Sequence, residues 1–216
     1  MKRAYVGLAL VGGALALGAC SGDQVASTAQ SQTPLAGVVC PPAGTVVRRD
    51  NGSYLRYGGA DPADPATCII GTPNGGTVKA LGGLIVTHPI NAAQRQQALA
   101  SLFPLAPGRA SHVRYGLVSP ANPAAHSIPF EESFRVTGES TVQLADGPRQ
   151  TWVVQGALTS IADPGVRFRS TYQIDKQTGA VLAYDNSSPT GAVVGAAALP
   201  YRVLEMTVPG QVASTR

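Results

Sequence analysis

Apolar and polar residues alternate at every second position over much of the chain after residue 110. The clearest stretch is 166–175, where Val166, Phe168, Tyr172 and Ile174 share one parity and polar side chains occupy the other. Because successive side chains of a strand point to opposite faces of a sheet, this pattern predicts a strand with one buried and one exposed face. Shorter runs with the same alternation occur at 113–117, 134–139 and 151–155. We therefore expect an antiparallel sheet to dominate the fold.

Composition excludes two other ways of organising a chain of 216 residues. Only 13% of the residues are charged, and the 25 glycines and 17 prolines stay below the share typical of low-complexity chains. A chain with so little charge is not kept open by self-repulsion, so disorder throughout is not expected. Lysine and glutamate are scarce and no apolar heptad persists, which excludes a long coiled coil.

Turn-forming residues predict a hairpin early in the chain. The segment 45–57 has the pattern of two strands joined at 50–53, where Asn51 and Gly52 tolerate the positive φ of a tight turn. The segment 58–67 contains two Asp-Pro pairs, and we expect it to be an irregular return to the next strand.

One stretch, 92–103, carries sustained helix formers. Asn91 is a suitable N-cap for it and Pro104 ends it. Leu99 and Leu102 belong to a modest apolar face on this helix. We expect a single helix at about 92–103, packed against the sheet.

The first twenty residues have the pattern of an export signal. Lys2 and Arg3 form a basic end, and the uncharged, mostly apolar segment 4–19 is shorter than the roughly 20 residues of a spanning helix. The sequence Leu17-Gly18-Ala19-Cys20 that follows resembles the lipobox of bacterial lipoproteins. The resemblance implies cleavage before Cys20 and a diacylglycerol on its sulfur, with palmitate among the acyl chains. The alternative is an ordinary secretory signal with a chance cysteine.

Ser21 follows the lipidated position, where an aspartate would favour retention in the inner membrane of enterobacteria. We therefore expect an outer-membrane anchor with the protein facing the periplasm. From Ser21 to Val39 the chain is rich in Ser, Gly, Gln, Thr and Ala and lacks either structural period. This segment is expected to be a flexible tether with an r.m.s. span of roughly 24 Å.

Cys40 and Cys68 are the other two cysteines of the chain. An exported protein meets an oxidising compartment, so with Cys20 taken by lipid we expect these two to form a disulfide. The alternative is a reactive or metal-binding cysteine, although neither lies in a CxxC motif or near a histidine in the sequence.

Together these features predict a mainly β (α+β) fold: a curved antiparallel sheet with one helix, preceded by a disulfide-closed hairpin segment. The expected parts are a signal peptide (1–19), the lipidated cysteine and tether (20–39), the disulfide-closed hairpin segment (40–70), the β-domain (71–210) and a tail (211–216). The run from Thr171 to Leu182, with Asp175, Thr178 and Gly179 at its turn, resembles a strand-turn-strand motif of periplasmic β-domains, some of unknown function. Its Asp, Thr and Gly are explained by turn chemistry and imply no catalytic residue.

Charge argues against nucleic acid as a partner. Removing Lys2 and Arg3 with the signal leaves 14 of the 16 basic residues against 12 acidic ones, a formal balance of +2. Proteins that bind nucleic acid neutralise many phosphates and carry a marked basic excess. We therefore expect no nucleic-acid partner.

The chain lacks a recognisable catalytic or metal-binding motif. His88, His112 and His126 are too widely spaced for a typical metal pair, and we expect neither a metal nor a cofactor. Glu131 and Glu132 are adjacent, but neighbours in a strand point to opposite faces, so they should not act as an acid/base pair.

The most informative polar residues are four arginines. Arg114, Arg135, Arg167 and Arg169 would lie on the outer face of the sheet if their strands pair. Several guanidinium groups on one surface can hold carboxylates or phosphates of the cell envelope. The alternative is an ordinary exposed face on which Glu139 and Asp175 neutralise the arginines.

The sequence thus favours a non-enzymatic binding or structural module of the cell envelope, with an anionic component or envelope protein as partner. A second hypothesis is a carrier of lipid or another apolar ligand held between the helix and the sheet. An envelope enzyme is the third hypothesis, and a cleft that combines His112 with a carboxylate would favour it.

Overall fold

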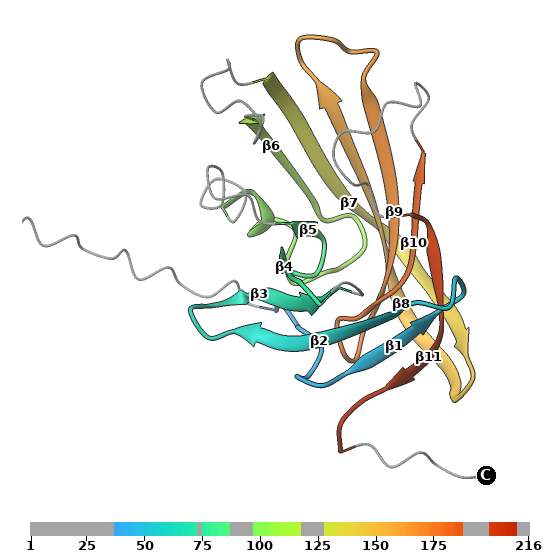
Figure 1. Ribbon diagram of the computed structural model, residues 1–216. Coiled ribbons are helices and arrows are strands. Elements are labelled where there is room, and N and C mark those ends of the chain that lie inside the picture. The colour runs from blue at the N-terminus through green and yellow to red at the C-terminus, as the bar shows by residue number, and fades with distance from the viewer. Residues whose placement is uncertain (1–36, 73–74, 87–96, 118–127, 188–198, 211–216) are drawn as a thin grey trace, which may run out of the picture. The chain divides into compact units, whose positions relative to one another are not determined.

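The computed structural model describes residues 37–72, 75–86, 97–117, 128–187 and 199–210 (Figure 1). Its eleven strands form one antiparallel sheet, which confirms the mainly β fold. The strands are β1 (Val46–Arg49), β2 (Tyr54–Asp61), β3 (Asp64–Gly71), β4 (Thr77–Leu81), β5 (Ile85–Val86), β6 (Ala110–Leu117), β7 (Ile128–Leu144), β8 (Gly147–Ser160), β9 (Arg167–Asp175), β10 (Val181–Ser187) and β11 (Tyr201–Thr207). Within these residues the sheet is open, with the order β5-β4-β3-β2-β1-β11-β10-β9-β8-β7-β6.

Two meanders make up the sheet. Strands β1 to β5 pair in chain order, and so do β6 to β10 (Figure 1). We call them the N-terminal meander (β1–β5) and the C-terminal meander (β6–β10). Strand β11 lies between β1 and β10 and joins them. The segments 40–70 and 71–210 therefore belong to one continuous sheet, in which β3 pairs with β4.

Local hydrogen bonds explain the turns of the N-terminal meander. Asn51 Oδ1 accepts a hydrogen bond of 3.0 Å from the backbone amide of Ser53. Gly52 has a φ of 80°, as the expected hairpin requires. The expectation of an irregular segment over 58–67 is wrong. Strand β2 continues to Asp61, whose Oδ1 accepts from the Ala63 amide at 3.0 Å and so forms the turn into β3.

The long strands of the C-terminal meander follow the alternation seen in the sequence. Phe134, Val154 and Ile174 are buried on one face of the sheet. Phe168 and Tyr172 lie on the same face but are only half-buried. This apolar face is therefore more completely covered at one end of the meander than at the other.

A bulge in β7 changes which residues share a face. Up to Val136 the register keeps Arg135 on the polar side of the strand. Beyond it one extra residue reverses the parity, so Glu139 lies opposite Trp152. There Glu139 pairs with Lys176 Nζ at 2.6 Å, and this ammonium lies 3.9 Å from the centre of the Trp152 ring.

The expected helix at 92–103 is described from residue 97 onward. Residues 97–99 are helical, and Leu99, Leu102 and Phe103 are buried in the main core with residues of both meanders. The first part of the expected helix and its N-cap, Asn91, lie outside the described residues. No helix in the described ranges is long and apolar enough to cross a membrane.

Aromatic side chains continue the core across β11. The ring centres of Tyr172 and Tyr184 are 5.1 Å apart, and those of Tyr184 and Tyr201 are 6.0 Å apart. The guanidinium of Arg49, from the N-terminal meander, lies 4.8 Å from the centre of the Tyr201 ring. Burial raises the pKa of Tyr57 to about 12, so its hydroxyl stays protonated in the core at neutral pH.

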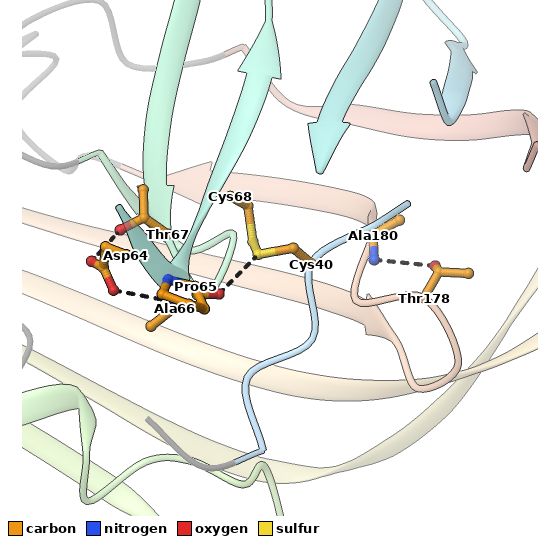
Figure 2. Close-up of a disulfide and its surroundings, with 8 residues drawn as sticks. All are labelled: Cys40, Asp64, Pro65, Ala66, Thr67, Cys68, Thr178 and Ala180. Atoms are coloured by element: carbon orange, nitrogen blue, oxygen red, sulfur yellow. Dashed lines mark hydrogen bonds between the residues drawn. A yellow bond between two sulfur atoms is a disulfide. The ribbon is translucent and has the colours of Figure 1, made fainter. Parts of the chain in front are cut away.

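The expected disulfide joins Cys40 to Cys68 (Figure 2). Cys68 is fully buried in β3, and Cys40 precedes β1, with their Cα atoms 5.3 Å apart. The same N-terminal segment packs against the turn after β9. Gly179 in that turn has a φ of 75°, and a Cβ there would overlap the carbonyl of Val39. The beginning of the described chain is therefore held by a covalent bond and by close packing.

Candidate functional site

The register of the C-terminal meander brings the four candidate arginines to one face of the sheet. Arg114 of β6 lies opposite Glu131 of β7, and this row of side chains ends at Arg167 of β9. Arg169 and Arg135 belong to the next two rows on the same face. We call the surface defined by Arg114, Arg135, Arg167 and Arg169 the arginine face.

A groove of about 600 Å³ crosses the arginine face. Arg135 and Arg169 line it, together with His112 at the edge strand, whereas Arg114 and Arg167 lie outside it. In the row of Arg169, β8 and β7 contribute only Ala157 and Ser133. These short side chains leave open space beside the guanidinium group.

An ion-pair cluster occupies the end of the arginine face next to β6. His112 Nε2 lies 2.8 Å from Glu131 Oε1, and Arg114 lies 3.0 Å from Glu131 Oε2. The hydrogen bond from His112, followed by that from Arg114, holds the pKa of Glu131 below its usual range. Both oxygens of this carboxylate are therefore engaged, and Arg114 has its counter-charge.

The other three arginines of the face lack such a partner. In the part of the chain that the structure describes, no hydrogen bond or ion pair joins the side chain of Arg135, Arg167 or Arg169 to another residue. The two acidic residues expected to neutralise them are engaged elsewhere: Glu139 pairs with Lys176, and Asp175 is buried and accepts from the Thr178 hydroxyl at 2.6 Å. The positive charge of the face is thus largely uncompensated.

The adjacent glutamates Glu131 and Glu132 point to opposite faces, as expected for a strand. Glu132 is buried and accepts from the Tyr115 hydroxyl at 3.0 Å. On this side of the sheet it lines a cavity of about 160 Å³ with aromatic residues that include Phe168 and Tyr184. The two carboxylates therefore lie on opposite sides of the sheet and do not form an acid/base pair.

The segment that follows the helical turn borders a small cavity against the sheet. This cavity measures about 130 Å³, and its lining includes Phe103, Leu105, Trp152 and Ile174 as well as Asp175 and Lys176. Sites for small molecules typically measure about 300–1,000 Å³. This cavity does not support the hypothesis of a lipid carrier.

Several residues considered in the sequence lie outside the described residues: Cys20, His88 and His126. Among the residues that are described, no group of three His, Cys, Asp or Glu side chains is placed to hold a metal ion. The sequence did not single out Ser133 or Gln155, which line the groove. Only the pairing of β6 to β9 reveals their position, since neither belongs to a motif.

Comparisons with known proteins find a structural similarity but no sequence match. No protein-family model and no curated protein sequence matches this chain. The crystal structure of the hypothetical lipoprotein YmcC from Escherichia coli (K12) is similar to it, with a TM-score of 0.47 and 15% sequence identity. The similarity covers 79% of this chain and 89% of the other. The functional argument therefore rests on the residues of this chain.

Proposed function

We propose that this chain is a lipid-anchored protein of the bacterial cell envelope that binds an anionic envelope component through the arginine face. The observation that carries the proposal is the set of three arginines, Arg135, Arg167 and Arg169, that bond to no other described residue. Each guanidinium presents a planar fork of donors that matches carboxylate or phosphate oxygens. An anion can therefore bind here without first breaking an internal ion pair.

The N-terminal sequence supports the anchor. A basic end, the apolar segment 4–19 and the lipobox-like Leu17-Gly18-Ala19-Cys20 follow one another in the order typical of lipoprotein signals. Several acyl chains on Cys20 would give durable membrane attachment, where a single chain gives only marginal binding. Ser21 favours the outer membrane, and the segment after it would let the folded part reach components of the periplasm.

A binding role suits the His112–Glu131 pair better than a catalytic one. Their side chains are 51% and 38% exposed, so water is not excluded from the pair. Glu131 also bonds to Arg114, which holds the carboxylate in its ionised form. The pair thus fits a structural ion-pair cluster at the sheet edge, and it lends no support to general acid or base chemistry.

The anchor is tested by changing its cysteine. Cys20→Ser should leave an uncleaved precursor and abolish incorporation of labelled palmitate, because the lipid-bearing thiol is lost. The double variant Cys40→Ser/Cys68→Ser is the matched control and should still be labelled. Normal labelling of the Cys20→Ser chain would overturn the lipoprotein proposal.

Binding is tested by removing the unpaired charges together. The variant Arg135→Gln/Arg167→Gln/Arg169→Gln and the wild-type protein should be used in parallel pull-downs from solubilised envelopes at low and high salt. We expect the wild type to retain an anionic component at low salt only, since exposed charges are screened at high ionic strength. An identical, salt-independent set of partners for both proteins would contradict the proposal.

A further inference from the structure

We infer that the groove between Arg135 and Arg169 is a binding site for a phosphate group. The inference rests on the proposed function and deepens it, because it assigns binding to one part of the arginine face and names the chemistry of the ligand. The site comprises two arginines that line the same groove of about 600 Å³, with hydroxyl and amide side chains between them.

The two arginines approach the groove from different strands. Arg135 is on β7 and Arg169 is on β9, with β8 between them and an offset of two residues along the strands. Ordinary strand spacing and rise place their Cα atoms about 12 Å apart. Side chains as long as arginine can lean toward each other over this span, so a ligand in the groove is within reach of both guanidinium groups.

The space between the arginines is kept open by small residues. Ala157 of β8 lies directly opposite Arg169, and Gly156 precedes it in the same strand. A Cβ on Gly156 would lie 2.9 Å from the ring of Phe134, which is buried beneath the sheet. The backbone under the groove is thus closely packed from below. The groove therefore has a firm base and does not need to form on binding.

The number of donors favours phosphate over carboxylate. Two arginine forks line the groove, and Ser133, Gln155 and Thr171 add hydroxyl and amide groups. A carboxylate has two oxygens, which a single guanidinium fork can occupy. A phosphate group presents three or more oxygens around a tetrahedral centre and can accept from both arginines and a neutral donor at once.

The acidic residues near the groove do not compete for these arginines. Glu131, on the same face, bonds to His112 and Arg114. Asp185 lies in the same row as Arg135, and its carboxylate lies 3.9 Å from Arg202. A bound phosphate would therefore meet positive charge that no described carboxylate has already neutralised.

The phosphate can belong to a lipid headgroup or be free in the periplasm. Isothermal titration of the lipidated protein in a nonionic detergent distinguishes the two sources. Inorganic phosphate is one probe, a short-chain phosphatidic acid below its micelle concentration is the second, and citrate is the carboxylate comparator. Binding of the phosphatidic acid alone would assign the site to headgroups, and binding of both phosphate probes would show that the phosphate group suffices. Either result supports the inference.

Variants of the two groove arginines are compared with arginine variants outside the groove. Arg135→Gln and Arg169→Gln should each weaken phosphate binding about tenfold, since each removes one fork. Arg56→Gln removes an equal charge from β2 and should not change the affinity more than about twofold. Arg167→Gln removes an equal charge from the arginine face outside the groove and should weaken binding less than Arg169→Gln does. Arg169→Lys keeps the charge without the fork and should give an intermediate loss. Circular dichroism would check that each variant is folded.

Three results would overturn the inference. If neither phosphate probe binds the wild type, or if citrate binds as tightly, the phosphate assignment is wrong. If Arg167→Gln weakens binding as much as Arg169→Gln, the charge of the whole face binds the anion and the groove has no special role. In that last case the proposed function stands and the groove inference falls. The proposed function itself is contradicted if the wild type and the triple arginine variant retain the same partners in the pull-down.

Discussion

The two meanders of the sheet differ in strand length and in how they are held together. In the N-terminal meander no strand exceeds 8 residues, and the Cys40–Cys68 disulfide fastens it. The C-terminal meander contains strands of 17 and 14 residues and has no covalent link. Long strands bury enough side chains to hold their own register, and a held register aligns distant residues in rows. The candidate site is on the meander that has such rows.

The meanders also differ in the use of charge. In the N-terminal meander Lys79 pairs with Asp61, and Arg48 of β1 pairs with Glu205 of β11. On the arginine face, Arg135 and Arg169 have no such partner among the described residues. Paired charges are already committed to the fold, whereas unpaired ones are available to a ligand. The comparison therefore separates a disulfide-closed region from a region without a disulfide, in which two arginines without an ion-pair partner among the described residues line one groove.

The largest expected effect is on the core of the C-terminal meander. Phe134→Ala should lower the free energy of unfolding by about 3–5 kcal/mol, because this side chain is buried and its ring packs against Gly156 of the neighbouring strand. Urea denaturation followed by circular dichroism measures it. Phe168→Ala should cost clearly less, since Phe168 is only half-buried. Arg167→Gln is the surface control and should stay within roughly 0.5 kcal/mol. A loss at position 167 as large as the loss at position 134 would show that the face assignment is wrong.

The second largest effect is expected from removing the disulfide, which should destabilise the N-terminal meander before the C-terminal one. Cys40→Ser/Cys68→Ser should destabilise the chain by about 3–4 kcal/mol in the chain-entropy description of a closed loop of this size. Amide hydrogen exchange should show the loss of protection first in β1 to β3 and later in β7 and β8. Uniform loss of protection across both meanders would mean that they unfold as one unit and that the contrast is unfounded.

The smallest effect concerns the paired charges. The hydrogen bond from Lys79 holds the pKa of Asp61 below its ordinary value of 3.8. A carboxyl whose pKa is depressed by folding stabilises the native state above its unfolded pKa, and this stability is lost as the pH falls through the folded value. The urea concentration at the midpoint of unfolding should therefore decrease as the pH is lowered from 6 to about 3. Lys79→Gln should make this decrease smaller. Arg56→Gln, which changes an exposed arginine of the same meander, should leave this pH dependence unchanged.

Much of the fold could be predicted from the sequence because alternation and turn residues are local signals. The alternation in 166–175 placed Phe168 and Tyr172 on one side, and the turn at 50–53 is where the sequence puts it. The return of β11 between the two meanders depends on distant pairing and leaves no local pattern. The segment 58–67 was misjudged because its Asp-Pro pairs suggest a loop, although Asp61 forms a tight turn between two strands.

The candidate site was predictable only in part, for the same reason. Parity along each strand was enough to put Arg114, Arg135, Arg167 and Arg169 on one face. It could not show that Glu139 leaves this face, because the bulge after Val136 is not visible in the sequence. Nor could it show the groove, which exists because small residues of β7 and β8 happen to align with Arg169.

The central claim is that anion binding belongs to the face of the C-terminal meander and does not follow from net charge. Two charge-matched variants of the lipidated protein test it directly: Arg135→Gln/Arg169→Gln, and Arg48→Gln/Arg56→Gln from the N-terminal meander. Each loses two positive charges, and binding of solubilised envelope material is measured at low salt. We predict that the first variant loses most of the binding while the second keeps nearly all of it. Equal losses in the two variants would contradict the account.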